Sequence, residues 1–252
     1  MKFKTLQWNI GGGKIKDIHN SEIEKYSTEG MDYIVNEISK HSPDIITLQE
    51  THQSGEYNQV KIIAEKLGYN YFINDIYDKS HVESGQGLGQ AIISRFPIKS
   101  HSFSFFENPK LEIITPEGEK WISHNKGVSK VLIQIDDNNL EAATLHLVPF
   151  RRFKVDVLRD DFKKLRDNIQ GLISPTNDKY LLQGDFNFDN ASLANLINLS
   201  DINVEEVLQI VPTTPKNRKY DHIIYKNLEC TSSETINNVL TDHYPIISTF
   251  EI

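Results

Sequence analysis

Cysteine, long apolar runs and excess positive charge are all lacking in this chain of 252 residues. Cys230 is its single cysteine, which excludes an internal disulfide and agrees with a reducing compartment. No apolar run approaches the roughly 20 residues that a membrane-spanning helix needs. Met1 to Lys4 leads directly into a polar strand rather than into a signal peptide. We therefore expect a cytoplasmic protein without a transmembrane segment.

Acidic residues outnumber basic ones, and the formal net charge is −8 at pH 7. This balance argues against tight, unselective binding to duplex DNA, because such binding depends on many contacts from lysine and arginine to phosphate. A local basic patch is still compatible with a nucleic-acid substrate. Part of the acidic excess is expected at a site for a divalent cation, which would partly neutralise it.

Sequence repeats and nucleotide-binding loops are also missing. No period of roughly 20 to 50 residues recurs, which excludes a solenoid. Gly11 to Gly13 are not followed by Gly-Lys-Ser/Thr and lack GxGxxG spacing, so they do not favour a phosphate-binding loop. Hydrophobic residues make up 38% of the chain, enough for a core. Since the motifs below run from residue 9 to residue 243, we predict one domain over 1–252.

The segment 180–187 reads Tyr-Leu-Leu-Gln-Gly-Asp-Phe-Asn, an apolar run that ends at Gly184 and then presents Asp185 and Asn187. If the backbone stays extended, the period of two places both polar side chains on the same face. A carboxylate beside an amide can hold and deprotonate a water, or help to ligate a hard cation. A strand followed by an Asx-type turn is the alternative for the same residues.

Five other fragments end an apolar run in a polar group that can bind a metal or move a proton. They are Gln7-Trp8-Asn9-Ile10, Leu48-Gln49-Glu50, Thr144-Leu145-His146-Leu147, Tyr220-Asp221-His222 and Leu240-Thr241-Asp242-His243-Tyr244-Pro245. Together with the segment 180–187, their order and spacing resemble the endonuclease/exonuclease/phosphatase superfamily. That group contains deoxyribonucleases, repair nucleases, neutral sphingomyelinases and inositol polyphosphate 5-phosphatases. The resemblance extends from Leu6 to the C-terminus.

The mixture of predicted helices and strands indicates an α+β layered domain. Helices are predicted over 27–40, 57–67, 153–173 and 193–199, and strands over 3–10, 45–48, 69–73, 88–94, 128–135, 140–147, 222–225 and 244–250. The resemblance implies the architecture, a four-layer α/β/β/α sandwich of two mixed, mainly antiparallel sheets flanked by helices. It also implies a site at one edge, where loops of both sheets meet.

Three residues are predicted to hold Mg²⁺ or Mn²⁺. Glu50 is the first choice, because a carboxylate at a strand end gives the cation a hard oxygen ligand and leaves places for water and phosphate. Asn9 would orient the same metal shell or donate to a phosphate oxygen. Asp242 and His243 are adjacent on an extended segment, so a hydrogen bond between them is not expected. The resemblance implies that Asp242 approaches the metal while His243 contacts a phosphate oxygen.

Cleavage of a phosphodiester also requires an aligned, deprotonated water and a stabilised leaving oxygen. Asp185 is the predicted general base, and Asn187 would aim the water or hold the phosphate. The resemblance implies that His146 serves as an acid or phosphate ligand, and that Asp221 polarises the catalytic histidine or steers the leaving group. Orientation of His243 by Asp221 is the alternative assignment for that pair.

Two basic clusters are predicted to bind substrate. Arg151 and Arg152 lie at the start of the helix predicted over 153–173, where the macrodipole prefers acids, so a bound anion would resolve their placement. Lys216, Arg218 and Lys219 form the second cluster, just before Asp221. Loops at that point contact substrate in the superfamily that the chain resembles.

The sequence therefore predicts a Mg²⁺- or Mn²⁺-dependent phosphodiesterase, a nuclease that acts on DNA or RNA by water attack. The first alternative is a phosphatase or phospholipase C-type hydrolase that acts on inositol phosphates or sphingomyelin. The second alternative is an inactive binding protein of the same fold, which the complete set of polar residues argues against. We expect the chain to act as a monomer.

Overall fold

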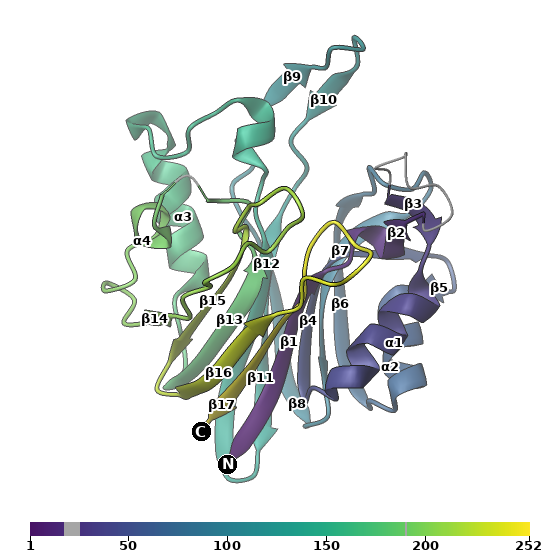
Figure 1. Cartoon of the computed structure of the whole chain (residues 1–252). Coiled ribbons are helices and arrows are strands. Elements are labelled where there is room, and N and C mark those ends of the chain that lie inside the picture. The colour runs from purple at the N-terminus through teal and green to yellow at the C-terminus, as the bar shows by residue number, and fades with distance from the viewer. Residues whose placement is uncertain (18–25, 190) are drawn as a thin grey trace.

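Two large β-sheets lie face to face, and helices cover the outer side of each sheet (Figure 1). The structure is a computed structural model that describes residues 1–17, 26–189 and 191–252. The layers follow the order helix, sheet, sheet, helix, so the predicted α/β/β/α sandwich is confirmed. Each sheet contains one parallel pair of strands and is otherwise antiparallel, as expected.

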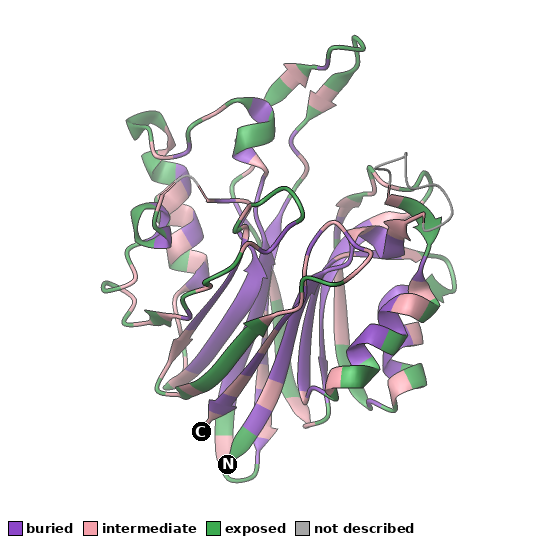
Figure 2. Cartoon of the chain, viewed as in Figure 1, coloured by how far each residue is buried: buried purple, intermediate pink, exposed green. Residues whose placement is uncertain are grey.

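The first sheet has the strand order β16-β17-β1-β4-β7-β6, with β5 paired to β4. Its strands are β1 (Lys2–Asn9), β4 (Ile45–Ser54), β5 (Tyr57–Asn58), β6 (Tyr71–Lys79), β7 (Gly87–Ser94), β16 (Glu229–Thr235) and β17 (Ile246–Glu251). Helices α1 (Met31–His41) and α2 (Gln59–Leu67) pack on its outer face (Figure 1). Strand β16 lies at the edge and is largely exposed, whereas the central strands are buried (Figure 2).

The second sheet has the strand order β14-β15-β13-β12-β11-β8. Its strands are β8 (Ile98–Phe105), β11 (Gly127–Ile135), β12 (Asn138–His146), β13 (Lys179–Asp185), β14 (Glu205–Glu206) and β15 (Asp221–Lys226). Helices α3 (Lys163–Ile173) and α4 (Leu193–Leu196) cover its outer face. Smaller elements are β2 (Lys14–Lys16), β3 (Tyr26–Glu29), β9 (Glu112–Ile114), β10 (Lys120–Ile122) and the 3₁₀ turns η1 (Gly11–Gly13), η2 (Phe150–Phe153) and η3 (Asp160–Phe162).

Strand alternation divides the buried side chains among three apolar cores. On β1, Leu6 and Trp8 face the helices, whereas Phe3 faces the opposite sheet. The same parity holds on β13, where Leu182 packs toward α3 and Leu181 packs between the sheets. One core therefore lies under each helical layer, and the third lies between the sheets.

The helix predicted over 153–173 is wrong in its first half, because α3 begins only at Lys163. Lys154 adopts a left-handed backbone with φ of 57°, and the Asp156 carboxylate accepts a hydrogen bond from the backbone N–H of Leu158 at 3.0 Å. Both features break a helix. The periodic apolar residues still reach the same core, but from turns, so Arg151 and Arg152 lie in η2 and not at a helix start.

Several other predicted boundaries also differ from the structure. The Ser/Thr cap expected for the first helix is wrong, since residues 26–29 form β3 and α1 follows Gly30. Strand β4 does not end at Glu50 but continues to Ser54. Strand β6 is longer than predicted and α4 is shorter. The remaining predicted helix and strands are present, with ends shifted by a few residues.

The two termini lie together at one end of the molecule, opposite the edge described next (Figure 1). The Met1 amino group donates to the carbonyl oxygen of Ile252 at 3.1 Å, because β1 and β17 pair antiparallel. None of the helices in the described parts of the chain is long and apolar enough to cross a membrane.

Candidate active site

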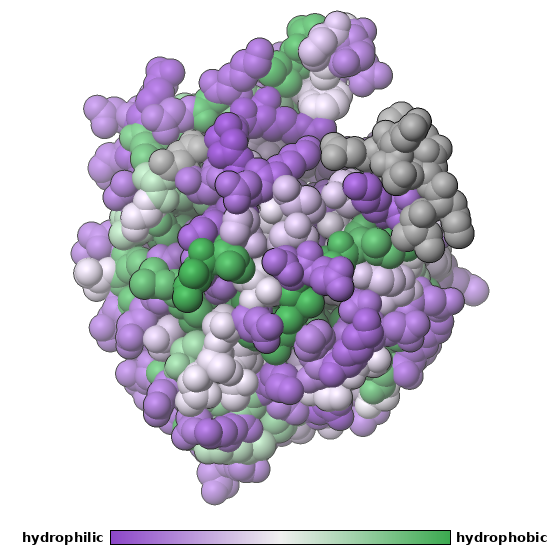
Figure 3. Space-filling view, in the orientation of Figure 1, coloured by the Kyte–Doolittle hydropathy of each residue, from purple (hydrophilic) through white to green (hydrophobic). Residues whose placement is uncertain are grey.

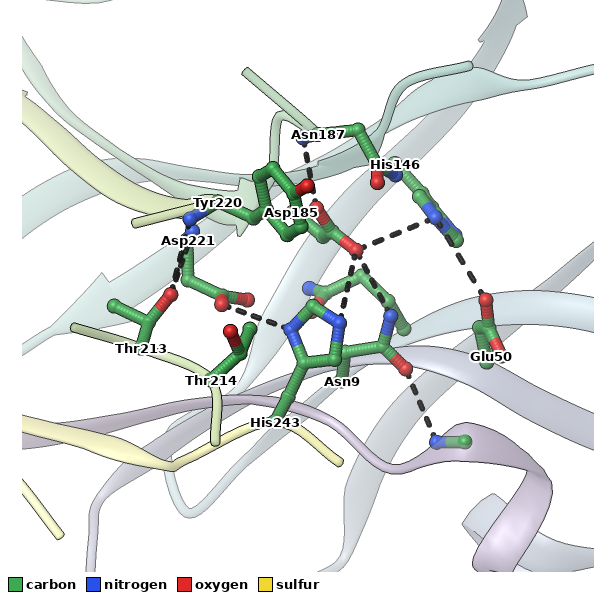
Figure 4. A network of polar contacts seen from close by, with 12 residues as sticks. Asn9, Glu50, His146, Asp185, Asn187, Thr213, Thr214, Tyr220, Asp221 and His243 are labelled. Carbon is green, nitrogen blue, oxygen red and sulfur yellow. Dashed lines mark hydrogen bonds and ion pairs between the residues drawn. The ribbon is translucent and has the colours of Figure 1, made fainter. Parts of the chain in front are cut away.

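Polar side chains from both sheets converge at the edge where β1, β12 and β13 end (Figure 4). These three strands end at Asn9, His146 and Asp185. Strands β15 and β17 run antiparallel to their neighbours and begin at the same edge, which brings in Asp221 and the Asp242–His243 pair. The segments far apart in sequence therefore meet as the resemblance implied.

His243 lies between two carboxylates. Its Nδ1 is 2.9 Å from Asp221 Oδ2, and its Nε2 is 3.7 Å from Asp185 Oδ2. Burial lowers the pKa of His243, but the charges of Asp221 and Asp185 outweigh burial and raise it well above the usual value. The orientation of His243 by Asp221, left open by the sequence, is present. Asp221, and not the adjacent Asp242, is thus the carboxylate that orients the His243 ring.

Asp185 is almost fully enclosed, with 1% of its surface exposed. Its Oδ2 accepts a hydrogen bond from Asn9 Nδ2 at 2.9 Å, and its Oδ1 accepts one from the backbone N–H of Asn187 at 2.8 Å. Burial raises the pKa of Asp185 to about 7, even though the charge of His243 and both hydrogen bonds oppose that rise. A carboxyl group with this pKa can exchange a proton near neutral pH.

Asn187 does not continue the strand, so its predicted placement on the same extended face as Asp185 is wrong. Its φ is 48°, and the bond from its N–H to Asp185 Oδ1 closes an Asx-type turn. Its side-chain Nδ2 donates to the carbonyl oxygen of Leu147 at 3.0 Å. The turn that the sequence left as an alternative is therefore what fixes the Asp185 carboxylate.

His146 is held by groups that the sequence analysis did not single out. Lys126 Nζ lies 2.9 Å from His146 Nδ1, and the Tyr77 hydroxyl lies 3.0 Å from the same nitrogen. Burial and the charge of Lys126 lower the pKa of His146 well below the usual value. A neutral imidazole that accepts from Lys126 at Nδ1 carries its proton on Nε2, which faces Asp185 Oδ2 at 3.4 Å.

Lys126 is a buried cation with 4% of its surface exposed. Burial lowers its pKa to about 8, whereas the charges of Glu50 and Asp185 oppose that fall. Nothing in the sequence distinguishes Lys126 from surface lysines, because it precedes a strand instead of ending one.

Glu50 and Asp242 are the carboxylates best suited to a cation. Glu50 sits at a bulge of β4 with φ of 55°, which turns its side chain toward the site, 3.9 Å from His146 Nε2. Burial raises the pKa of Asp242, and the charge of Glu50 raises it further. Asp242 Oδ1 is buried and has no hydrogen-bond partner among the described residues. A hard cation fits this orphaned oxygen and the two adjacent negative charges.

Asn9 contributes differently from the other predicted ligands. Its Nδ2 donates to Asp185, and its Oδ1 accepts from the backbone N–H of Gly11 at 3.0 Å, which leaves one lone pair on the oxygen. A second set of possible ligand atoms, on Asp185, Asp221 and His243, lies within 4.8 Å of one another.

The glycine turn η1 shapes the floor next to Asp242. Gly11 and Gly12 have positive φ, and a Cβ atom on Gly11 would lie 3.0 Å from Asp242 Oδ1. A Cβ atom on Gly12 would come within 2.3 Å of the His52 ring. Gly11 and Gly12 therefore allow close packing beside the site.

The predicted arginine pair lies on the rim. The Arg152 guanidinium stacks on the Trp121 ring at 3.8 Å, and Glu50 is close enough to oppose the lowering of the Arg152 pKa by burial. Burial raises the pKa of the Tyr220 phenol, and the charge of Arg151 lowers it. Arg151 is therefore close enough to Tyr220 to interact with it. Both arginines thus border the site from η2.

The second basic cluster is only partly turned to the site. Arg218 also lies near Tyr220, but it pairs with Asp189 at 3.2 Å. Lys219 Nζ donates to the carbonyl oxygen of Gln209 at 2.7 Å, and Lys216 is exposed. Tyr220 itself is tilted over His243, with ring centroids 6.3 Å apart.

His222 is separate from the site, because successive side chains of a strand point to opposite faces of the sheet. It lies on the outer face of β15, where its Nδ1 is 2.8 Å from Glu206 and its Nε2 is 3.0 Å from the carbonyl oxygen of Phe188.

Comparisons with known proteins agree with this geometry. The model of the "Endonuclease/Exonuclease/phosphatase family" matches residues 6–243. The chain is similar to an endonuclease/exonuclease/phosphatase from Beutenbergia cavernae, with 13% identity, a TM-score of 0.75, and coverage of 100% of this chain and 72% of that chain. A family protein from Leptotrichia buccalis shows 17% identity, a TM-score of 0.70 and coverage of 99% and 100%.

A third solved structure is D. rerio TDP2 complexed with a single-strand DNA product. It shows 14% identity, a TM-score of 0.64, and coverage of 100% of this chain and 99% of that chain. Identities this low establish similarity of fold alone. No curated protein sequence gives a significant match.

Proposed function

The chain belongs to the endonuclease/exonuclease/phosphatase family, whose members hydrolyse phosphoric esters, and from that premise we propose a divalent-metal-dependent nuclease. The proposed reaction is attack of water on a phosphodiester of DNA or RNA. One observation carries the proposal: His243 is held between Asp221 at 2.9 Å and Asp185 at 3.7 Å, in a site rich in carboxylates. We propose that residues 1–252 act as one domain and as a monomer.

Glu50 and Asp242, with the free lone pair of Asn9, are the proposed holders of Mg²⁺ or Mn²⁺. The orphaned Asp242 oxygen and its neighbouring negative charge support this assignment. When bound, the cation supplies charge neutralisation and polarises a phosphoryl oxygen. Members of the family generally use divalent metals.

Asp185 is the proposed general base for the attacking water. Its pKa of about 7 lets it accept a proton, and the bonds from Asn9 and Asn187 fix its two oxygens. His243 is the proposed donor to a phosphate oxygen, because its raised pKa keeps Nε2 protonated while Asp221 holds Nδ1. His146, backed by Lys126, is the proposed second phosphate contact.

Features of the rim support a polynucleotide. The Arg152–Trp121 stack lies on the Glu50 side, and Tyr220 with Arg151 and Arg218 lies on the His243 side. Arginine suits phosphate contacts and aromatic rings suit base stacking, so both flanks of a strand would find partners. The similar fold of a protein solved with a single-strand DNA product agrees with this choice.

A lipid phosphodiester is the second candidate, favoured by exposed aliphatic side chains. Leu208 is 80% exposed and Ile210 is 92% exposed, in the segment that links β14 to β15, where Figure 3 shows a hydrophobic patch. Ile114, in the hairpin that projects beside the site, is 62% exposed. Exposed aliphatic groups of this kind can insert into a lipid surface.

The first experiment measures hydrolysis of bis-p-nitrophenyl phosphate with Mn²⁺ and with EDTA. Asp185→Asn and His243→Ala are each expected to lower kcat/KM by at least about a hundredfold, the usual scale for losing an acid–base or charge-stabilising group. His222→Gln is the matched control, since it removes a buried histidine from the other face of β15. Turnover that survives either site substitution would remove that residue from its role.

The second experiment compares plasmid, single-stranded DNA, RNA, inositol phosphates and sphingomyelin vesicles as substrates. Cleavage of a polynucleotide that depends on metal supports the nuclease. Cleavage of lipid alone, lost after Leu208→Ser with Ile210→Ser, supports the second candidate instead. A folded protein that cleaves none of them would be the inactive binding protein.

A further inference from the structure

Buried glutamines join the two sheets directly beneath the site. Gln7, Gln49 and Gln90 come from the first sheet and Gln183 from the second, and each is 0% exposed. Their side-chain nitrogens donate across the interface to Asp221 Oδ1 at 3.0 Å, Thr144 Oγ1 at 2.8 Å, the Thr144 carbonyl oxygen at 3.0 Å and Thr5 Oγ1 at 2.9 Å. These amides, and not apolar contacts, bridge this part of the sandwich.

This arrangement is costly for stability. The Oε1 atoms of Gln7, Gln90 and Gln183 are buried without a partner among the described residues. Each unpaired buried acceptor destabilises the fold, whereas facing aliphatic side chains would fill the space without that penalty. Packing alone therefore does not account for this set of buried amides.

Of these four glutamines, only Gln7 has a side chain that hydrogen-bonds a site residue within the described parts of the chain. The Asp221 carboxylate can only accept, so the Gln7 atom facing it is the amide nitrogen. The same nitrogen donates to Gln49 Oε1 at 2.8 Å, and Gln49 is held in turn by Thr144. The other oxygen of Asp221 accepts from His243 Nδ1 at 2.9 Å.

We propose that Gln7 is a positioning residue that fixes the rotation of the Asp221 carboxylate. With Oδ1 bound to Gln7, Oδ2 faces His243, and the imidazole is held with Nε2 toward Asp185. This inference rests on the proposed function of the site. Because Gln7 is fully buried between the sheets, it acts on the catalytic step and not on substrate binding.

The test compares Gln7→Met with Gln90→Met. Methionine keeps the length of the side chain and removes the donor. Gln90 is a close match, since it is fully buried, its nitrogen donates to Ser129 Oγ at 2.9 Å and to the Thr144 carbonyl oxygen at 3.0 Å, and its Oε1 is unpartnered. The two substitutions are therefore expected to change the melting temperature to a similar degree.

Catalysis is expected to separate the two variants. Gln7→Met should lower kcat for bis-p-nitrophenyl phosphate at least about tenfold with KM within about twofold, the scale of a misplaced catalytic group. Gln90→Met should leave both constants within about twofold of the wild type. Equal kcat in the two variants would overturn the proposal. If Gln7→Met does not fold, Gln7→Asn and Gln90→Asn give the same comparison, because the shortened amide no longer reaches its partner.

A second readout does not depend on turnover. The imidazole Nδ1–H proton of His243 should give a protected NMR signal, identified by its loss in His243→Gln. This signal is expected in the wild type and in Gln90→Met and should vanish or exchange rapidly in Gln7→Met. An unchanged signal in Gln7→Met contradicts the proposal, whether or not the wild type hydrolyses an ester. A wild type that hydrolyses no ester would refute the proposed function, which is a separate result.

Discussion

The two ends of the space between the sheets are built from opposite kinds of side chain. The end near the termini is filled by apolar residues, among them Phe3, Ile45, Ile92, Ile133, Leu140, Leu181, Ile223 and Phe250. The end near the site is filled by amides, hydroxyls and carboxylates, among them Thr5, Gln7, Gln49, Gln90, Thr144, Gln183, Asp221 and Asp185. Both sets belong to the same faces of the same strands.

Single strands show the change most clearly. The inward face of β13 runs from Leu181 through Gln183 to Asp185. The inward face of β1 changes in the same direction, from Phe3 to Asn9. Each apolar side chain stabilises the fold by about 1.5–3 kcal/mol, whereas buried polar atoms without partners destabilise it. The apolar end near the termini thus stabilises the sandwich, whereas the polar end carries the candidate active site.

Removal of divalent metal should have the largest effect, and only at the polar end. We expect EDTA to lower hydrolysis of bis-p-nitrophenyl phosphate by at least about 1,000-fold, equivalent to about 4 kcal/mol of transition-state stabilisation. Addition of Mn²⁺ should raise the melting temperature of the wild type and not that of Glu50→Gln, because the cation binds the native state. An equal rise in melting temperature in both proteins would show that Glu50 does not bind the metal.

Leu181→Ala tests the apolar end. Leu181 is 1% exposed in the core between the sheets, so its truncation should lower the free energy of unfolding by about 2–5 kcal/mol. Measured well below the melting temperature, kcat should stay within about twofold of the wild type. Urea unfolding and steady-state kinetics check the two expectations. A large fall in kcat without loss of stability would break the division between the ends.

Asp242→Asn should show that a polar residue of the site lowers the stability of the fold. Burial and the charge of Glu50 raise the pKa of Asp242, so its ionised form is disfavoured in the folded protein without metal. We expect the variant to gain about 1 kcal/mol of stability in EDTA and to lose both activity and the rise in melting temperature with Mn²⁺. Asp189→Asn, which removes an acid paired to Arg218, is the control and should not gain stability.

The sequence was sufficient where strand parity decides the outcome. Asn9, His146 and Asp185 end buried strands, so their polar groups had to emerge at one edge once the strands aligned. The order of these fragments led to the correct fold and to the alternative in which Asp221 orients His243. The strands predicted over 128–135 and 140–147 are likewise present, as the antiparallel pair β11 and β12.

Departures from regular geometry could not be predicted in that way. The β4 bulge at Glu50 depends on pairing with β7, and the left-handed Asn187 is held by the carbonyl oxygen of Leu147, which follows the neighbouring strand β12. The apolar period of 153–173 suggested one helix, because turns that bury the same residues give the same period. Lys126 and Gln7 were missed since their partners are distant in sequence: His146 on the neighbouring strand β12 for Lys126, and Asp221 in the opposite sheet for Gln7.

His222 offers the smallest and most selective test, because it is buried beside Glu206 but lies outside the polar end. Burial lowers its pKa, yet the hydrogen bond and charge of Glu206 raise it above the usual value. A histidine whose pKa is raised in the folded state stabilises the protein fully below its unfolded pKa of about 6.5, and this contribution is lost as pH rises through the folded pKa.

Glu206→Gln should therefore lower the free energy of unfolding by about 1 kcal/mol at pH 6 and by much less at pH 9. Thermal unfolding at both pH values checks this expectation. At each pH, kcat of the variant should equal that of the wild type. A destabilisation that is equal at both pH values would show that Glu206 acts through packing, and a fall in kcat would show that buried polarity on the outer face of β15 also serves the site.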